Sequence, residues 1–303
     1  MSTTETAPTL SIPVKGSTFA YRRIGKPNAA NTPLIIHNFF LGNMDFWDPL
    51  FVNHLAQDRE VILFDNAGVG RSTGTVPTTF TGWAEDMIAF IEALSFKQID
   101  LLGFSISVCP ALEAAEIAPH LIRKLVLIGG HASVPAISDP PPVGIVWPRE
   151  SMGLEALGTY MTAYTPETVR NVVKETCFFN TQAGRTAANE YFERLQARQV
   201  PGEPLNLNFL PMEPSGNRQL ACSIATNTAF EGNSFDRMKE LKMPVLIIHG
   251  REDVIVPPSR AWEFVTQIVN AQLEILPMCG HAVPFEYPIK CADTVRRFLA
   301  GNE

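Results

Sequence analysis

Short apolar runs alternate with amphipathic stretches in the first part of the chain. Runs typical of buried strands occupy 33–38, 60–68, 98–104 and 122–130, after an expected hairpin at 10–25 whose turn is Lys15-Gly16. Between them, 80–96 places its large apolar side chains on one helical stripe: Trp83, Met87, Phe90, Ile91 and Leu94. Strands alternating with amphipathic helices predict an α/β fold with a mostly parallel central sheet and helices on both faces.

This alternation is interrupted in the middle of the chain. A proline-rich stretch at 134–148 breaks regular structure, and helical patterns without strands follow, at 150–164, 166–178, 184–199 and 217–230. Strand and helix patterns return from 243 onward. We therefore expect a sheet core formed by 1–132 and 236–303, with an inserted helical cap at 133–235 that covers one end of the sheet.

The composition fits a globular protein with a large core. The chain has 303 residues, of which 46% are hydrophobic and 18% charged. Its formal net charge is −7, so the chain lacks the excess of positive charge that is typical of nucleic-acid-binding proteins. No apolar run approaches the ~20 residues that a membrane-spanning helix needs. We expect a small-molecule substrate as the partner, with no nucleic acid and no membrane.

The spacing of the cysteine, histidine and glycine residues argues against disulfides, a helical metal site and a dinucleotide site. The five cysteines are scattered and form no C-x-x-C pair, so we expect reduced thiols. The N-terminus lacks a positive segment followed by an apolar one, so a cytoplasmic location is expected by default. No two histidines have the spacing of a helical metal site, and the turn at 68–70 lacks a dinucleotide-binding pattern. We expect no metal and no cofactor.

Three polar residues each follow a strand of the expected sheet: Ser105, Asp253 and His281. Because ligands bind outside the carboxyl ends of parallel strands, we expect these three side chains to gather at one edge. A serine hydroxyl becomes a nucleophile when a nearby base takes its proton and a carboxylate orients that base. The order serine, aspartate, histidine is the one found with a strand–serine–helix turn. The alternative is that Ser105 only caps a helix, as serine often does.

Five segments in this order give the chain its resemblance to the α/β-hydrolase superfamily, in its serine esterase and lactonase branch. They are GNMDFWDP (42–49), FDNAGVGRS (64–72), GFSIS (103–107), HGREDVIVP (249–257) and GHAVPFEYP (280–288). The resemblance implies that Ser105 is the nucleophile, Asp253 rather than Glu252 the acid, and His281 the base. A serine at this turn, where dehalogenases and epoxide hydrolases carry aspartate, argues against their chemistry.

Two positions depart from the family pattern. Ser107 stands where the family usually has glycine after the nucleophile, which puts a β-carbon and a hydroxyl at a crowded turn. The loop HNFFLGN (37–43) replaces the usual glycine of the oxyanion loop with a bulkier residue. The resemblance implies the backbone N–H of Ile106 as one oxyanion donor. The other is Phe40 if the loop is aligned on Gly42-Asn43, which we favour, or Phe39 if it is aligned on His37.

The leading hypothesis is a cofactor-independent serine hydrolase that cleaves a carboxylic ester or lactone of a largely apolar small molecule. Phe39 and Phe40 either line an apolar substrate pocket or pack within the loop. The expected cap adds apolar candidates for substrate binding, Trp147 and Phe178 first, with Met152, Tyr160, Met161 and Phe179. The same triad could serve carbon–carbon bond hydrolysis, lyase or perhydrolase chemistry. A non-catalytic ligand receptor on this fold is the third hypothesis.

Overall fold

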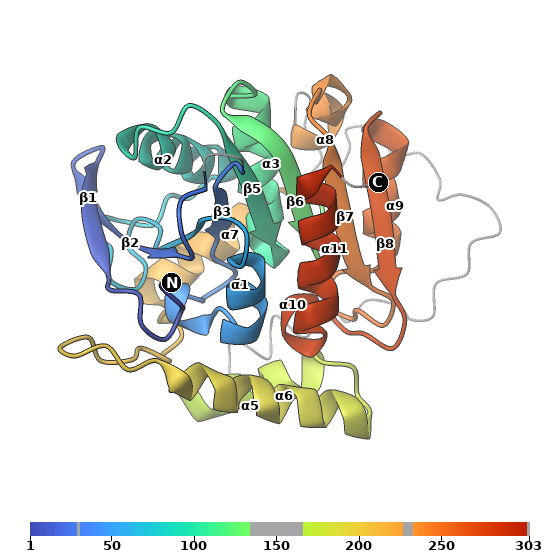
Figure 1. The fold of residues 1–303 in the computed structure, drawn as a ribbon. Helices are drawn as coiled ribbons and strands as arrows, with labels where there is room; N and C mark the ends of the chain where they lie inside the picture. Colours follow the sequence, from blue (N-terminus) through green and yellow to red (C-terminus); the bar gives the residue numbers. More distant parts are fainter. Residues whose placement is uncertain (29–30, 134–165, 227–232, 302–303) are drawn as a thin grey trace.

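The computed structural model describes residues 1–28, 31–133, 166–226 and 233–301. Its described strands form one eight-stranded sheet in the order β1-β2-β4-β3-β5-β6-β7-β8 (Figure 1). β1 and β2 form the expected hairpin, β2 pairs antiparallel with β4, and the later neighbours pair in parallel. The strands are β1 Leu10–Val14, β2 Ser17–Ile24, β3 Leu34–His37, β4 Val61–Phe64, β5 Ile99–Phe104, β6 Ile122–Ile128, β7 Val245–Gly250 and β8 Ala271–Leu276.

Helices cover both faces of this sheet, as the alternating pattern predicts. Because successive strand residues point to opposite faces, the apolar side chains divide into two cores. α1 and α11 cover one core, and α2, α3 and α9 cover the other (Figure 1). The helices of the core are α1 Pro49–Leu55, α2 Phe80–Ala93, α3 Val108–Ile117, α8 Ser234–Arg237, α9 Ser259–Gln267, α10 Val283–Glu286 and α11 Pro288–Ala300.

Helices from the interrupted region lie at the end of the sheet where β5, β7 and β8 finish. α5 Pro166–Thr176 and α6 Gln182–Arg194 cross this end beside α1 and α10, and α7 Asn217–Thr226 follows them in the chain (Figure 1). Three of the expected helical segments therefore form helices. The fourth, at 150–164, lies outside the described residues. The boundaries of the cap stay a prediction.

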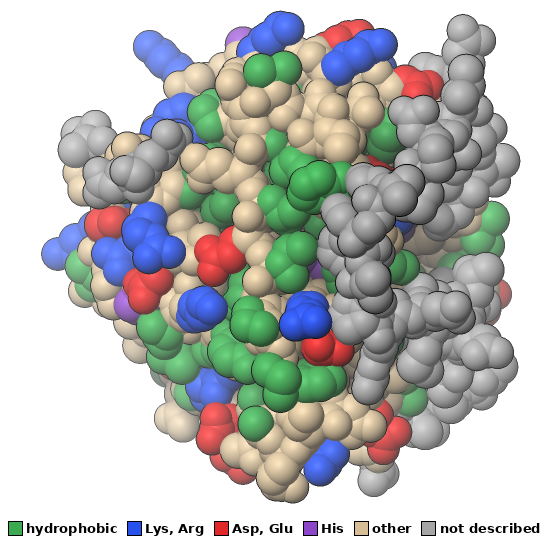
Figure 2. Space-filling model, turned by 90° about the vertical axis from the view of Figure 1, so that its right-hand side faces the viewer, with side chains coloured by type: hydrophobic (Ala, Val, Ile, Leu, Met, Phe, Trp, Pro, Cys, Tyr) green, Lys and Arg blue, Asp and Glu red, His purple; other side chains and the backbone are tan. Residues whose placement is uncertain are grey.

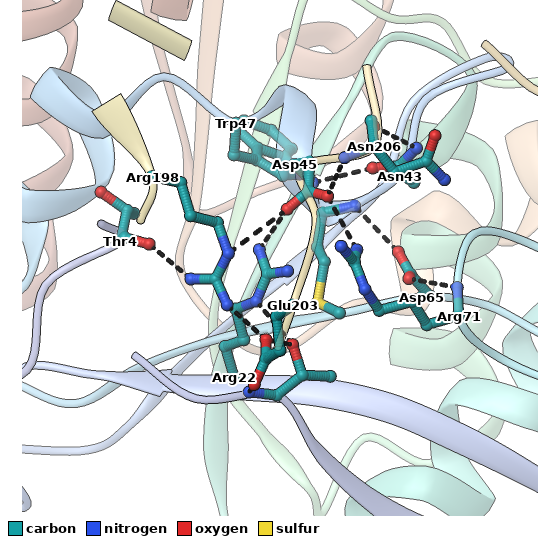
Figure 3. A network of polar contacts seen from close by, with 12 residues as sticks. Thr4, Arg22, Asn43, Asp45, Trp47, Asp65, Arg71, Arg198, Glu203 and Asn206 are labelled. Carbon is teal, nitrogen blue, oxygen red and sulfur yellow. Dashed lines mark hydrogen bonds and ion pairs between the residues drawn. The ribbon is translucent and has the colours of Figure 1, made fainter. Parts of the chain in front are cut away.

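A buried network of charged side chains joins the core to the residues that follow α6 (Figure 3). Asp45 accepts hydrogen bonds from Arg22 at 2.6 Å and Arg71 at 2.7 Å. Arg198 lies 3.8 Å from Asp45 and forms a 2.6 Å ion pair with Glu203. These residues come from β2, from the loops after β3 and β4, and from the segment after α6. The network therefore fixes several separate parts of the chain to one carboxylate.

The remaining features of the fold are its surface and its cysteines. Figure 2 looks onto the side of the molecule that carries β8 and α9, where hydrophobic side chains form a central band among charges of both signs. No helix in the described part of the chain is long and apolar enough to span a membrane. The five cysteines all lie in described segments, and each is a free thiol.

Candidate active site

Ser105 lies on a strained turn between β5 and α3. The strand ends at Phe104, and Ser105 then adopts a φ of 59°, in the left-handed region that non-glycine residues rarely occupy. Gly103 makes this turn possible, because a β-carbon there would lie 2.6 Å from the carbonyl oxygen of Ser107. Strain of this kind is typical of functional sites, where the surrounding structure enforces it.

His281 connects this hydroxyl to a buried carboxylate. Its Nε2 lies 2.8 Å from Ser105 Oγ, and its Nδ1 lies 2.8 Å from Asp253 Oδ2. An ionised carboxylate can only accept, so Nδ1 carries the hydrogen and Nε2 accepts the serine proton. The Ser105 hydroxyl therefore bonds to a base and not to the N–H groups of the following helix. The three residues that follow separate strands meet in one hydrogen-bonded line.

Asp253 has a full set of donors around it. Its Oδ1 accepts from the backbone N–H groups of Ile255 at 2.8 Å and Val256 at 2.9 Å. His249 Nε2 lies 3.2 Å from Asp253 Oδ2 and hydrogen-bonds the carbonyl of Val256 at 2.9 Å. Burial alone would raise the pKa of Asp253, but electrostatic interactions and hydrogen bonds with His281 and His249 hold that pKa well below its ordinary value. The carboxylate is thus ionised and fixed in orientation.

Ser107 stands where the family usually has glycine, and hydrogen bonds accommodate its side chain. Its buried hydroxyl accepts from the N–H of Phe104 at 2.7 Å and lies within donating distance of the carbonyls of Phe104, at 2.8 Å, and His37, at 3.2 Å. It therefore links the ends of β5 and β3. The next residue, Val108, has room because Gly130 lacks a β-carbon, which would lie 2.4 Å from Val108 Cγ2.

The loop after β3 is held by side chains that the sequence analysis did not single out. Asn38 donates to the carbonyl of Phe64 at 2.8 Å and accepts from the indole N–H of Trp47 at 3.0 Å. The N–H of Leu41 donates to Gln219 of α7 at 2.8 Å. Amide side chains of this kind carry no distinctive sequence pattern. Their role becomes visible only when the strand ends are brought together.

Three backbone N–H groups are the predicted candidates for an oxyanion hole. Ile106 follows Ser105 in the first turn of a helical segment, where backbone N–H groups lack partners within the helix. Among the described residues, the N–H groups of Phe39 and Phe40 donate to no other group. Ile106, Phe40 and Phe39 therefore stay the predicted donors. The structure does not distinguish between Phe40 and Phe39.

The aromatic candidates for substrate binding differ in their surroundings. The Phe39 ring packs among the rings of Phe46, Trp47, Phe104 and Phe285, at centroid distances of 5.5 to 6.4 Å. Phe40 is partly buried against the same core. Phe178 is buried next to Tyr191 of α6, at 6.0 Å between ring centroids. Trp147, Met152, Tyr160 and Met161 lie outside the described residues.

No group of three His, Cys, Asp or Glu side chains within the described segments could hold a metal ion. The geometry is instead that of a serine, an imidazole and a carboxylate in series. Comparison with known proteins adds the family. The model of the alpha/beta hydrolase fold family matches residues 32–288. The chain belongs to the α/β-hydrolase fold family.

Relatives of this α/β-hydrolase carry enzyme names. A 2-hydroxymuconate semialdehyde hydrolase of Pseudomonas putida is 30% identical, over 81% of this chain and 78% of its own length. A putative carbamate hydrolase RutD of Rhizobium rhizogenes is 26% identical, over 94% of this chain and 98% of its own. The solved α/β-hydrolase fold protein from Chitinophaga pinensis superimposes with a TM-score of 0.82 at 26% identity, with 98% of each chain covered. These comparisons confirm the predicted fold and identify the protein as a hydrolase.

Proposed function

We propose that the protein is a serine hydrolase that cleaves a carboxylic ester or lactone through Ser105, His281 and Asp253. The observation that carries the proposal is the pair of 2.8 Å contacts from His281, one to Ser105 and one to Asp253. A base in hydrogen-bond reach of a hydroxyl, itself oriented by a carboxylate, is the arrangement that activates a serine nucleophile.

The first half of the reaction forms an acyl-enzyme. Ser105 Oγ attacks the substrate carbonyl carbon while its proton passes to His281 Nε2. The carbonyl oxygen becomes an oxyanion, held by the N–H groups of Ile106 and Phe40. The carbon–oxygen bond to the leaving alcohol then breaks, and His281 gives that alcohol its proton. Asp253 keeps the Nδ1–H of His281 in place and stabilises the imidazolium between these two transfers.

The second half releases the acid. His281 takes a proton from water, the hydroxide attacks the acyl carbon, and the bond to Ser105 Oγ breaks as the proton returns to the serine. Phe40 and the residues expected in the cap, Trp147 and Phe178 among them, would favour an apolar acyl or ring group. No metal or cofactor enters any step.

A panel of activated esters and lactones of increasing acyl length tests this proposal. We expect the wild type to release acid from apolar members of the panel, and Ser105→Ala to lose this activity by at least about 1000-fold. Folding of the variant is checked by circular dichroism. Turnover by Ser105→Ala at the wild-type rate would contradict the proposal.

Hydrolysis of a carbon–carbon bond next to a carbonyl is the second candidate. It is favoured by the relatives named 2-hydroxymuconate semialdehyde hydrolase, one of which is 30% identical. That semialdehyde is itself the probe, since its consumption can be followed by absorbance. Ser105-dependent consumption of the semialdehyde, with no turnover of the ester panel, would replace the first proposal with this one.

A further inference from the structure

Glu286, the last residue of α10, has an unusual position for a charged side chain. Glu286 is only 8% exposed. Its Oε2 accepts a hydrogen bond from the N–H of Gly280, the residue before His281, at 2.8 Å. The N–H of Phe179 donates to the same carboxylate at 3.2 Å. Among the described residues no lysine or arginine pairs with it. Burial raises the pKa of Glu286, which its hydrogen bonds only partly offset.

A second link holds the other side of the histidine. The N–H of Ala282, the residue after His281, donates to the carbonyl of Cys177 at 2.7 Å. Both neighbours of His281 are therefore tied to Cys177–Phe179, the segment that joins α5 to α6. One tie is direct, and the other runs through the Glu286 carboxylate.

The two backbones are fitted to each other where they meet. A β-carbon on Gly280 would lie 2.6 Å from the Cys177 carbonyl oxygen, and one on Gly184 would lie 1.9 Å from the Phe179 carbonyl oxygen. Gly280 thus lets the loop around His281 approach Cys177, whereas Gly184 lets α6 approach the backbone of Phe179. Next to it, Tyr191 of α6 stacks on Phe285 at 4.6 Å between ring centroids.

A buried carboxylate without a cation costs stability unless its hydrogen bonds compensate. Those bonds join the loop that carries His281 (277–282, the histidine loop) to the segment between α5 and α6. We propose that Glu286 is a positioning residue, which seats Cys177–Phe179 against the histidine loop and thereby aims His281 at Ser105. On this proposal, His281 is aligned with Ser105 only while Cys177–Phe179 is packed against the histidine loop. The inference rests on the proposed role of His281 as the base.

The expected consequence is a loss of rate rather than of binding. A shift of the base by about 1 Å can cost roughly 100-fold in rate. Glu286→Gln keeps the size and one acceptor oxygen, whereas Glu286→Ala removes both. Glu274→Gln is the matched control, because Glu274 is a partly buried glutamate on β8 that bonds the Thr294 hydroxyl.

Saturation kinetics of Ser105 labelling by a fluorophosphonate, combined with hydrogen exchange of the full chain, provide the test. We expect Glu286→Gln to slow the maximal labelling rate about 10-fold and Glu286→Ala about 100-fold. The half-saturating probe concentration should stay within about twofold in both variants. Exchange protection should fall together at 177–182 and 279–283 and remain unchanged in the other segments. Glu274→Gln should match the wild type.

Wild-type labelling and exchange in Glu286→Ala would overturn the inference. Slow labelling with protection lost throughout the chain would also overturn it, because Glu286 would then serve general stability alone. Failure of the proposed function has a different signature. In that case the wild type itself would not be labelled at Ser105, or His281→Ala would be labelled as fast as the wild type.

Discussion

Two buried carboxylates, Asp253 and Asp45, have equally crowded polar surroundings but partners of different chemistry. Burial would raise the pKa of each, and in each case the neighbouring groups hold the pKa below its ordinary value. Asp253 faces imidazole rings and backbone N–H groups. Asp45 faces guanidinium groups of Arg22 and Arg71 (Figure 3).

The difference lies in whether the partner can move a proton. An imidazole is held by the carboxylate through one nitrogen and offers the other to Ser105, so that second nitrogen can take up a proton and give it back. Arginine stays protonated and has no acceptor, so its contact with a carboxylate only fixes geometry. On the proposed mechanism, the buried acid that faces histidine serves the reaction, whereas the one that faces arginine serves the fold. Substitutions at four residues can break or sharpen this contrast.

Asp253→Asn should give the largest effect, on activity. The amide can reverse the hydrogen bond to His281 and favour the wrong tautomer, a change that costs ~10⁴-fold in the best-studied triads. The steady-state rate on the best ester of the panel measures it, with thermal unfolding as a control for the fold. A loss of less than about 10-fold would mean that Asp253 does not orient the base.

Asp45→Asn should instead act on stability. It leaves the buried guanidinium group of Arg22 and the partly exposed one of Arg71 without their counter-charge, and loss of one partner of a buried pair typically costs about 3–5 kcal/mol. Chemical denaturation would measure this loss. The folded fraction should still label at Ser105 within about threefold of the wild-type rate. Labelling that falls as steeply as in Asp253→Asn would remove the contrast between the two sites.

Ser107→Ala asks what a neutral hydroxyl contributes at the same turn. The N–H of Phe104 loses its acceptor in a buried site, so we expect a loss of about 1–3 kcal/mol in the free energy of unfolding. Ser107→Gly provides the comparison, since it restores the family residue but also lacks the hydroxyl. Denaturation midpoints at or above the wild-type value in both variants would show that the hydroxyl does not hold β5 to β3.

Glu116 also has a buried carboxylate, which pairs with Arg237 at 2.8 Å. Burial raises the pKa of Glu116 to about 8, with Glu113 and Glu240 adding to the shift and Arg237 opposing it. The folded state therefore binds the proton more tightly than the unfolded chain, and stability from this group falls as pH rises from about 4.5 to about 8.

Glu116→Gln should remove that dependence. Between pH 5 and pH 8.5 we expect the melting temperature of the wild type to fall by a few degrees more than that of the variant. Differential scanning calorimetry at several pH values measures this difference. Parallel pH profiles for the two proteins would mean that Glu116 is ionised in the fold like an exposed glutamate.

The sequence was sufficient to predict the fold and the meeting of Ser105, Asp253 and His281. Each follows a strand that hydrophobic patterning identifies, and parallel strands bring their carboxyl ends to one edge. The sequence left open whether Phe39 lines a pocket or packs within the protein, and it did not predict the bridge made by Glu286. Both depend on contacts between segments far apart in the chain, which local patterns do not encode. Trp147 lies outside the described residues.

The rate of Ser105 labelling by a fluorophosphonate in the wild type and in His281→Ala tests the central claim most directly. Mass spectrometry locates the modified residue. The account predicts stoichiometric labelling at Ser105 that slows by at least about 100-fold when His281 is removed. Labelling that is absent from the folded wild type, or equally fast in His281→Ala, would contradict it.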